Sequence, residues 1–235
     1  MVEVIDLTAR AVEPAGTVSP YTVTRVGLAD DAKAGLYREF GKRFLDIVLV
    51  CASAIVVVPL VAVLAVLVAL DGGSPLYRQE RIGQSGRRFQ LLKLRTMIPD
   101  AEEALSRMLR DDPALAAEWN ATQKLRHDPR VTRLGRLLRA SSLDELPQFW
   151  NVIRGEMSLV GPRPMMTDQR DLYRGAVYCD LRPGVTGLWQ VSARNAEGFS
   201  SRVDYDKTYD RKLSLMFDIR LMIRTVFVVM RGTGC

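Results

Sequence analysis

Histidine and cysteine are both scarce in this sequence of 235 residues. The single histidine, His127, excludes a metal centre built from several histidines, and its charged surroundings predict an exposed side chain. The three cysteines, Cys51, Cys179 and Cys235, are widely scattered. An odd set without regular spacing argues against a disulfide framework or a zinc site.

Acidic residues are outnumbered by basic ones, 27 to 33, which gives a formal net charge of +6. A basic balance fits anionic lipid, phosphate-bearing substrates or nucleic acid, and does not choose among them. Hydrophobic residues make up 48% of the chain, which allows a sizeable core, and charged residues make up 26%, which excludes a simple bundle of membrane spans. The length fits one domain or one domain with accessories.

Apolar periodicity is missing from residues 1–36, which contain several prolines and glycines. We predict a largely flexible tail over residues 1–38, with a short strand at 21–26. We do not expect a secretory signal peptide, because the apolar run starts too late and no cleavage pattern follows it.

Residues 47–70 form the longest apolar run and carry no charge. The run exceeds the roughly 20 residues needed to span a bilayer, so one interpretation is a transmembrane helix. Pro59 stands near the middle, where proline bends or breaks a helix. If the chain folds back there, each arm is about 18 Å long, too short to cross a core of about 30 Å. The second interpretation is therefore a re-entrant helix-break-helix over residues 39–71.

Basic residues flank the apolar run on both sides. They are Arg38, Lys42 and Arg43 before it, and Arg78, Arg81, Arg87, Arg88, Lys93 and Arg95 after it. Because positive residues favour the cytoplasmic side, a re-entrant helix places both flanks on one face, whereas a span places one flank on the wrong side. The pattern alone leaves both interpretations open.

Asp46 lies at the entrance of the apolar run, where a bare carboxylate in lipid is costly. Its spacing from Lys42 and Arg43 allows a pair along one helical face. The alternative is that Asp46 lies at the level of the lipid headgroups. Both interpretations put Lys42 and Arg43 at the membrane interface.

Residues 72–235 have the character of a small, mostly helical α+β globular domain. We predict strands at 76–79 and 89–94 around a glycine turn at 83–86. We predict helices at 100–110, 113–123, 135–139, 146–153 and 213–230. The last is apolar over most of its circumference, which fits either a core helix or an amphipathic interfacial helix.

Asp144 and Glu145 stand side by side after an arginine-rich segment. Ser142 and Glu145 match a capping box, which predicts a structural role, with Asp144 in the first turn where the helix dipole favours anions. The other interpretation is phosphoryl chemistry, because the preceding segment carries Lys124, Arg126, Arg130, Arg133, Arg136 and Arg139. A solvated basic face would give the same pattern.

Arg163 lies between Pro162 and Pro164, which hold its backbone extended and present its guanidinium with little loss of entropy. Guanidinium suits bidentate binding of phosphate. The following segment adds Arg182, Gln190, Arg194 and Asn195 around glycines. In such a site cations clamp phosphate, and a carboxylate either holds Mg²⁺ or attacks phosphorus.

Several stretches resemble, in order, the bacterial sugar transferases called monotopic phosphoglycosyl transferases. They are KRFLD, the apolar run with its central proline, YRQERIGQSGRRFQLLKLRTM, DPRVTRLGRLLRASSLDELPQFWNVIRGEMSLVGPRP and RPGVTGLWQVSARN. The match covers about residues 40–232 and most resembles members that start exopolysaccharide repeat units. It resembles the minimal catalytic form, without the several N-terminal spans of larger members. Val58 stands where some members have serine before the central proline.

The resemblance implies transfer of a sugar-1-phosphate from a UDP-sugar to polyprenyl (undecaprenyl) phosphate, with release of UMP. It also implies a re-entrant membrane helix, dependence on Mg²⁺ and a two-step mechanism. Asp144 matches the family's nucleophile, and Glu145 matches the glutamate that helps to bind magnesium. Arg139 and Arg163 match phosphate-binding arginines. The segment with Arg182, Gln190, Arg194 and Asn195 would help to hold the nucleotide, and we include Lys93 among the substrate-binding candidates.

The sequence-based hypothesis is an enzyme in the bacterial inner membrane, with its catalytic domain on the cytoplasmic face and in contact with membrane lipid. The alternative is a non-catalytic, membrane-tethered scaffold with a basic surface, in which the acidic pair is only a cap. Nucleic-acid binding is not expected, because the basic segment 124–139 lacks interleaved aromatic residues. The identity of the sugar and a homo-oligomeric state are left open.

Overall fold

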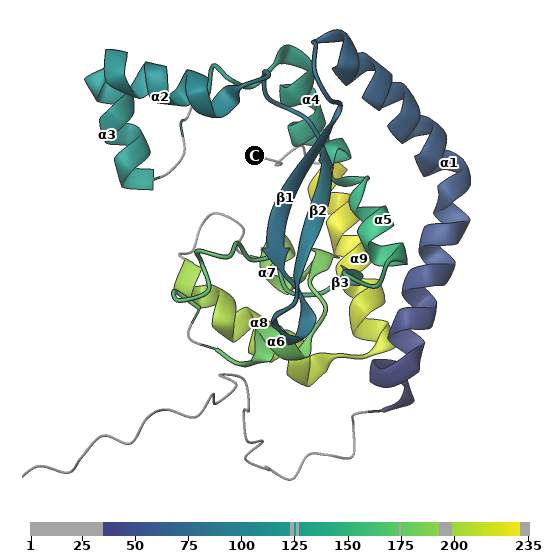
Figure 1. Ribbon diagram of the computed structural model, residues 1–235. Coiled ribbons are helices and arrows are strands. Elements are labelled where there is room, and N and C mark those ends of the chain that lie inside the picture. Colours follow the sequence, from purple (N-terminus) through teal and green to yellow (C-terminus); the bar gives the residue numbers. More distant parts are fainter. Residues whose placement is uncertain (1–34, 123–124, 126, 174, 193–198, 231–235) are drawn as a thin grey trace, which may run out of the picture. The chain divides into compact units, whose positions relative to one another are not determined.

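The computed structural model describes residues 35–122, 125, 127–173, 175–192 and 199–230. The chain divides into two units, Met1–Asp31 and Ala32–Cys235, and the first lies outside the described residues, as does the strand predicted at 21–26. The second unit is mostly helical, and its described part has two small two-stranded sheets (Figure 1). This confirms the predicted α+β class.

One long helix, α1 (Lys42–Leu70), carries the apolar run and follows a π-helical turn, Tyr37–Gly41. Within the described residues, it is the one helix long and apolar enough to cross a membrane. The helix continues through Pro59 and bends in its middle part (Figure 1). The structure therefore has a bend where a break between two helices was predicted, because a helix can kink at proline without ending there.

Both ends of α1 pack against the rest of the same unit. Near its beginning, Val50 belongs to a core cluster with Phe89, Leu91, Val152 and Met157. Near its end, Leu64 and Val68 pack with Leu94 and Leu138. Between these contacts lies an outward apolar surface that includes Ile55, Val56 and Val58, which are 83%, 69% and 63% exposed.

The predicted hairpin is confirmed: β1 (Leu76–Ile82) and β2 (Arg88–Leu94) pair antiparallel in continuous register. β1 is longer than predicted, because pairing continues up to the turn. β2 contacts α1 and also supplies Leu91 and Lys93 to the candidate site described below.

The helices after the hairpin begin and end close to their predicted positions. They are α2 (Ala101–Asp111), α3 (Pro113–Thr122), α4 (Arg133–Ser141), α5 (Gln148–Ile153) and α9 (Leu215–Met230). His127, between α3 and α4, is exposed as predicted. The prediction missed four elements of three to five residues, namely β3 (Ser158–Val160), α6 (Val177–Asp180), β4 (Gly184–Thr186) and α7 (Leu188–Ser192), and the eleven-residue helix α8 (Arg202–Lys212).

β3 and β4 pair in parallel, and glycines let their connecting backbones pass very close together. A Cβ atom at Gly184 would lie 2.1 Å from the amide nitrogen of Gly161, and one at Gly187 would lie 2.0 Å from the carbonyl oxygen of Gly161. Only glycine fits these positions. This crossing holds the Pro162–Arg163–Pro164 segment beside the start of α7.

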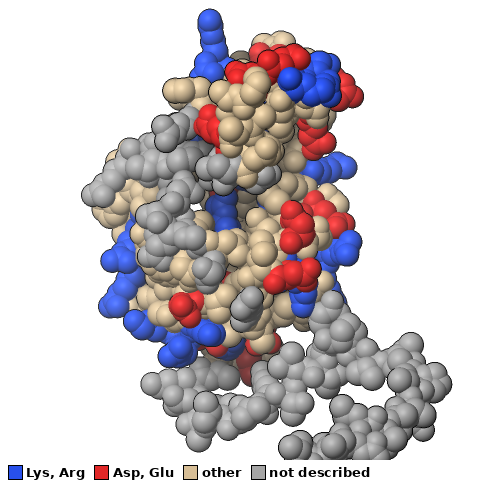
Figure 2. Space-filling view, turned by 90° about the vertical axis from the view of Figure 1, so that its left-hand side faces the viewer, with Lys and Arg blue, Asp and Glu red and all other residues tan. Residues whose placement is uncertain are grey.

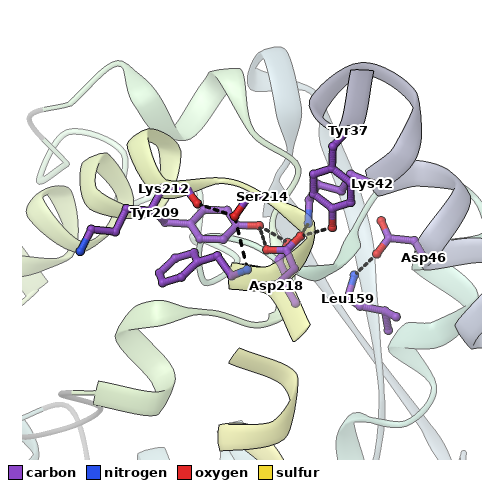
Figure 3. A network of polar contacts seen from close by, with 10 residues as sticks. Tyr37, Lys42, Asp46, Leu159, Tyr209, Lys212, Ser214 and Asp218 are labelled. Carbon is purple, nitrogen blue, oxygen red and sulfur yellow. Dashed lines mark hydrogen bonds and ion pairs between the residues drawn. The ribbon is translucent and has the colours of Figure 1, made fainter. Parts of the chain in front are cut away.

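A buried cluster, which we call the α1–α9 clasp, joins the beginning of α1 to α9 (Figure 3). Asp218, 1% exposed, accepts hydrogen bonds from the Tyr37 hydroxyl at 2.7 Å, the Lys42 ammonium at 2.7 Å and the Tyr209 hydroxyl at 2.8 Å. α9 therefore has a buried face, and it also exposes apolar side chains, among them Phe227 and Met230.

The clasp corrects the pairing predicted for Asp46. Lys42 pairs with Asp218, and Arg43 donates to the carbonyl oxygens of Val152 and Ile153. Asp46 is 3% exposed, and it accepts from the Leu159 N–H at 3.0 Å. Partners distant in sequence replace the local pair.

Candidate active site

The acidic pair lies on one 3₁₀ turn, Leu143–Glu145, between α4 and α5. Ser142 has a left-handed backbone (φ +56°), and its N–H donates to the Arg139 carbonyl oxygen at 3.1 Å, so it ends α4. Its side chain makes no capping hydrogen bond. The predicted capping box is therefore wrong, and capping does not explain the two acids.

Lys93 on β2 contacts both acids. Its Nζ atom lies 2.6 Å from Oε1 of Glu145 and 3.8 Å from Oδ2 of Asp144. Asp144 is only 7% exposed. Burial raises the pKa of Asp144, and the negative charge of Glu145 raises it further. The positive charges of Lys93 and Arg139 lower this pKa. Nearby cations are therefore needed to keep Asp144 ionised.

Arg139 is the member of the predicted basic segment that acts on Asp144. It lies in the last turn of α4, and its Nε donates to Oγ1 of Thr96 at 2.9 Å, which orients the guanidinium. Arg130 is engaged elsewhere, because it forms an ion pair with Asp128 at 2.6 Å. Lys124 and Arg126 lie outside the described residues.

A cleft beside the acidic pair collects several of the predicted site residues. It is lined by Arg81, Leu91, Lys93, Glu145, Gln148, Arg163, Pro164, Val185 and Gln190. Asp144 lies next to this cleft: it adjoins Glu145 in the chain and is 3.8 Å from the Nζ atom of Lys93, and both of these residues line the cleft. Figure 2 shows Lys and Arg side chains at the bottom of a hollow on one face of the molecule.

Of the predicted substrate-binding residues that the structure describes, Arg139 and Arg182 do not line this cleft. Arg182 turns away, because its Nε donates to the Gly155 carbonyl oxygen at 3.1 Å. Burial, followed by the charge of Arg43, lowers the pKa of Arg182. Arg194 and Asn195 lie outside the described residues. Their substrate-binding roles stay predictions.

Two further arginines of this region, Arg81 and Arg202, were not predicted as site residues. Arg81 was recognised as part of the basic flank of α1 and stands in one of the stretches that resemble the family, but no role was assigned to it; Arg202 lies on the unpredicted helix α8. The sequence does not signal that the two come together, because β1, the segment around Arg163 and α8 meet only in the folded chain.

The acidic pair has the donors for a magnesium ion shared with a substrate. Within the described residues, no group of three or more His, Cys, Asp or Glu side chains could hold a metal ion. Mg²⁺ in phosphoryl-transfer sites is commonly held by one or two carboxylates together with substrate phosphates and water. Asp144 and Glu145 fit that arrangement.

Comparison with known proteins gives a consistent family match. A model described as "Bacterial sugar transferase" matches residues 37–232. The chain is 45% identical over 197 residues to the "UDP-galactose-lipid carrier transferase" of Erwinia amylovora, covering 83% of this chain and 41% of that protein. It is 42% identical over 208 residues to the "Exopolysaccharide production protein ExoY" of Rhizobium meliloti, covering 86% and 92%.

A third relative is the "UDP-glucose:undecaprenyl-phosphate glucose-1-phosphate transferase" of Caulobacter vibrioides. The two chains are 40% identical over 196 residues, with 79% of this chain and 68% of the relative covered. The chain spans about two fifths of the length of several curated relatives that it matches.

Proposed function

This chain belongs to the bacterial sugar transferase family, and from that premise we propose that it transfers a sugar-1-phosphate from a UDP-sugar to polyprenyl phosphate and releases UMP. This reaction would be the first membrane step in the assembly of an exopolysaccharide or another glycoconjugate. The observation that carries the proposal is the buried Asp144 at the edge of a cationic cleft, within 3.8 Å of Lys93.

In the first step, a carboxylate oxygen of Asp144 attacks the phosphorus that carries the sugar. The new O–P bond gives a phospho-aspartate, and the bond to the bridging oxygen breaks, so that UMP leaves with the electron pair. In the second step, a phosphate oxygen of the polyprenyl phosphate attacks the same phosphorus. The carboxylate is released, and the product is a polyprenyl diphosphate sugar.

The surrounding cations stabilise charge on the phosphate groups during both steps. Lys93 lies closest to the two acids, Arg139 is oriented by Thr96, and Arg163 reaches the cleft from its proline-flanked segment. We assign Glu145 to hold Mg²⁺, which supplies further positive charge to the substrate phosphates when it is bound.

We propose that α1 enters one leaflet and returns, as a re-entrant helix in the bacterial inner membrane, with the catalytic unit on the cytoplasmic face. Support comes from the two ends of α1, which both pack against the same unit, and from the exposed apolar surface between them. If α1 crossed the bilayer as a straight span, its two ends would lie on opposite faces, about 30 Å apart. The basic flanks then lie together at the headgroups, as cytoplasmic segments do.

The topology is tested by cysteine labelling in membranes. In a background without the three native cysteines, we introduce Glu39→Cys, Ser74→Cys or Val58→Cys, the last as the buried-in-lipid control. A membrane-impermeant reagent added from the cytoplasmic side should label positions 39 and 74 but not 58. Labelling of 39 and 74 from opposite sides of the membrane would mean a span.

The reaction is tested by UMP release from purified protein with undecaprenyl phosphate and Mg²⁺. The panel of UDP-sugars should begin with UDP-galactose and UDP-glucose, because the names of relatives point to these sugars. We expect release with at least one sugar, dependent on the lipid phosphate for full turnover. No release with any sugar of the panel, by protein that remains folded, would favour the scaffold alternative.

A further inference from the structure

Three arginines from separate parts of the chain gather beside the cleft, and two of them lie against the ring of Trp189. Arg81 lies on β1, Arg163 follows β3, and Arg202 begins α8. The guanidinium carbon of Arg202 lies 4.5 Å from the centroid of the Trp189 ring, and that of Arg163 lies 5.9 Å from it. Arg81 and Arg163 line the cleft together. We call Arg81, Arg163 and Arg202 the arginine cluster.

The arginine cluster has no acidic partner of its own. In the part of the chain that the structure describes, none of the three guanidinium groups forms an ion pair with a carboxylate. The Nε atoms of Arg81 and Arg202 are buried and have no hydrogen-bond partner. Buried donors without partners are uncommon and costly, more so when they are charged. Within the described residues, part of each guanidinium is thus left without a protein acceptor, which favours binding of an anion from outside the chain.

The cluster also holds more positive charge than its surroundings neutralise. Burial, followed by the charge of Arg163, lowers the pKa of Arg81. Burial and then Arg163 lower the pKa of Arg202 to about 10. The negative charge of Asp206 raises the pKa of Arg202, but the Asp206 carboxylate accepts its hydrogen bond from the Tyr173 hydroxyl, at 2.9 Å. A bound anion would relieve the repulsion among the three cations.

The position of the cluster favours a nucleotide phosphate over a lipid phosphate. Helix α8 lies on the opposite side of the β1–β2 hairpin from α1 (Figure 1). The apolar surface of α1 is the part that would contact lipid. A lipid phosphate would thus reach the cleft from the α1 side, whereas the arginine cluster borders the cleft from the other side.

We propose that Arg81 and Arg202 act with Arg163 to bind the leaving phosphate of the UDP-sugar, the one that departs in UMP. This inference rests on the proposed function. When the bond to the bridging oxygen breaks, that oxygen takes the electron pair and the phosphate of UMP gains negative charge. Arg81 and Arg163 line the same cleft as Lys93 and Glu145, so the cluster can neutralise this charge while Asp144 holds the transferred phosphorus.

The test compares Arg81→Gln and Arg202→Gln with Arg88→Gln, a matched control. Arg88 lies on the same hairpin, is exposed and pairs with Glu80. Binding of UMP and of uridine to the full-length protein in detergent is measured by calorimetry. We expect each cluster variant to bind UMP about 10- to 100-fold more weakly, as for the loss of a hydrogen bond to a charged group. Uridine binding, and UMP binding by the control, should be unchanged.

Steady-state kinetics separate the two phosphates. The KM for the UDP-sugar should rise in both cluster variants, and the KM for undecaprenyl phosphate should stay within twofold. Unchanged UMP affinity, an equal loss for uridine, or a rise confined to the KM for undecaprenyl phosphate would each overturn the inference. Because Arg202→Gln also removes the stacking on Trp189, Arg202→Lys serves as a second variant, and it should retain more UMP affinity than the glutamine variant.

Failure of this inference differs from failure of the proposed function. If the wild-type protein turns over and both glutamine variants bind UMP as tightly as the wild type, only the inference is contradicted. If the wild-type protein shows no turnover with any UDP-sugar tested, the proposed function itself is contradicted.

Discussion

The α1–α9 clasp gives the sharpest prediction about stability. The changes are Lys42→Met, Asp218→Asn and the two together. Lys42 is 9% exposed and Asp218 is 1% exposed, so each single change leaves a buried group without its charged partner. The hydroxyls of Tyr37 and Tyr209 donate to different oxygens of Asp218, so in the asparagine variant one hydroxyl can donate to the amide oxygen and the other can accept from the amide nitrogen, which preserves the shape of the cluster.

Breaking a buried ion pair from one side costs about 3–5 kcal/mol, because the remaining charge is left uncompensated. For a chain of this size, each kcal/mol lowers the melting temperature by roughly 2–4 °C. Each single variant should therefore melt roughly 6–20 °C lower than the wild type. The double variant should lose clearly less than the sum of the two single losses, because neither charge is then left alone.

The assay is thermal unfolding of the purified protein in detergent, followed by circular dichroism at one heating rate for all four proteins. A fixed heating rate is needed because unfolding of such proteins is commonly irreversible. The exposed pair Arg88–Glu80 supplies a control, and Arg88→Met should shift the melting temperature by no more than a few degrees. Additive losses in the double variant, or single losses no larger than the control's, would refute the buried-pair reasoning.

Two pH-dependent predictions follow from the shifted carboxylates. Burial raises the pKa of Asp144 and Glu145 raises it further, so the rate of single-turnover UMP release should fall with decreasing pH from a point above the ordinary aspartate range of about 3.9. Glu145→Gln should move this acid limb to lower pH, and a limb that stays in place would contradict the assigned coupling. Burial raises the pKa of Asp206 to about 6 from 3.8, so its stabilising contribution is full below 3.8 and is lost as the pH rises through 6. Asp206→Asn should therefore stabilise the protein at pH 7.5, by up to about 3 kcal/mol for a shift of about two pH units, but not at pH 4, and equal melting shifts at both pH values would be the contrary result.

The parts of the fold that could be predicted from sequence are those with a local physical signal. The apolar run of α1 and the hairpin around Gly83–Gly86 depend on hydropathy and turn residues close together in the chain. Four of the five missed elements have five residues or fewer, and β3 and β4 depend on close backbone contacts among Gly161, Gly184 and Gly187. Such contacts join segments that are distant in sequence and leave no periodic pattern.

The errors at the site have the same origin. Ser142 matched a capping pattern, but its left-handed backbone ends α4 instead. The pairing considered for Asp46 was with neighbours one turn away, whereas its carboxylate accepts from the N–H of Leu159. Adjacent acids, a proline-flanked arginine and the family resemblance sufficed to predict Asp144, Glu145 and Arg163 as candidates. Arg81 and Arg202 required the folded chain, which alone brings them close to Arg163.

The central claim is a covalent bond between Asp144 and the phosphorus that carries the sugar. It is tested by incubating the purified protein with Mg²⁺ and a UDP-sugar labelled in the sugar, without a lipid acceptor, and measuring radioactivity on the denatured protein. We predict a labelled wild-type protein that loses its label when polyprenyl phosphate is added before denaturation, and no label on Asp144→Asn. Equal labelling of Asp144→Asn, or full turnover by that variant, would contradict the account.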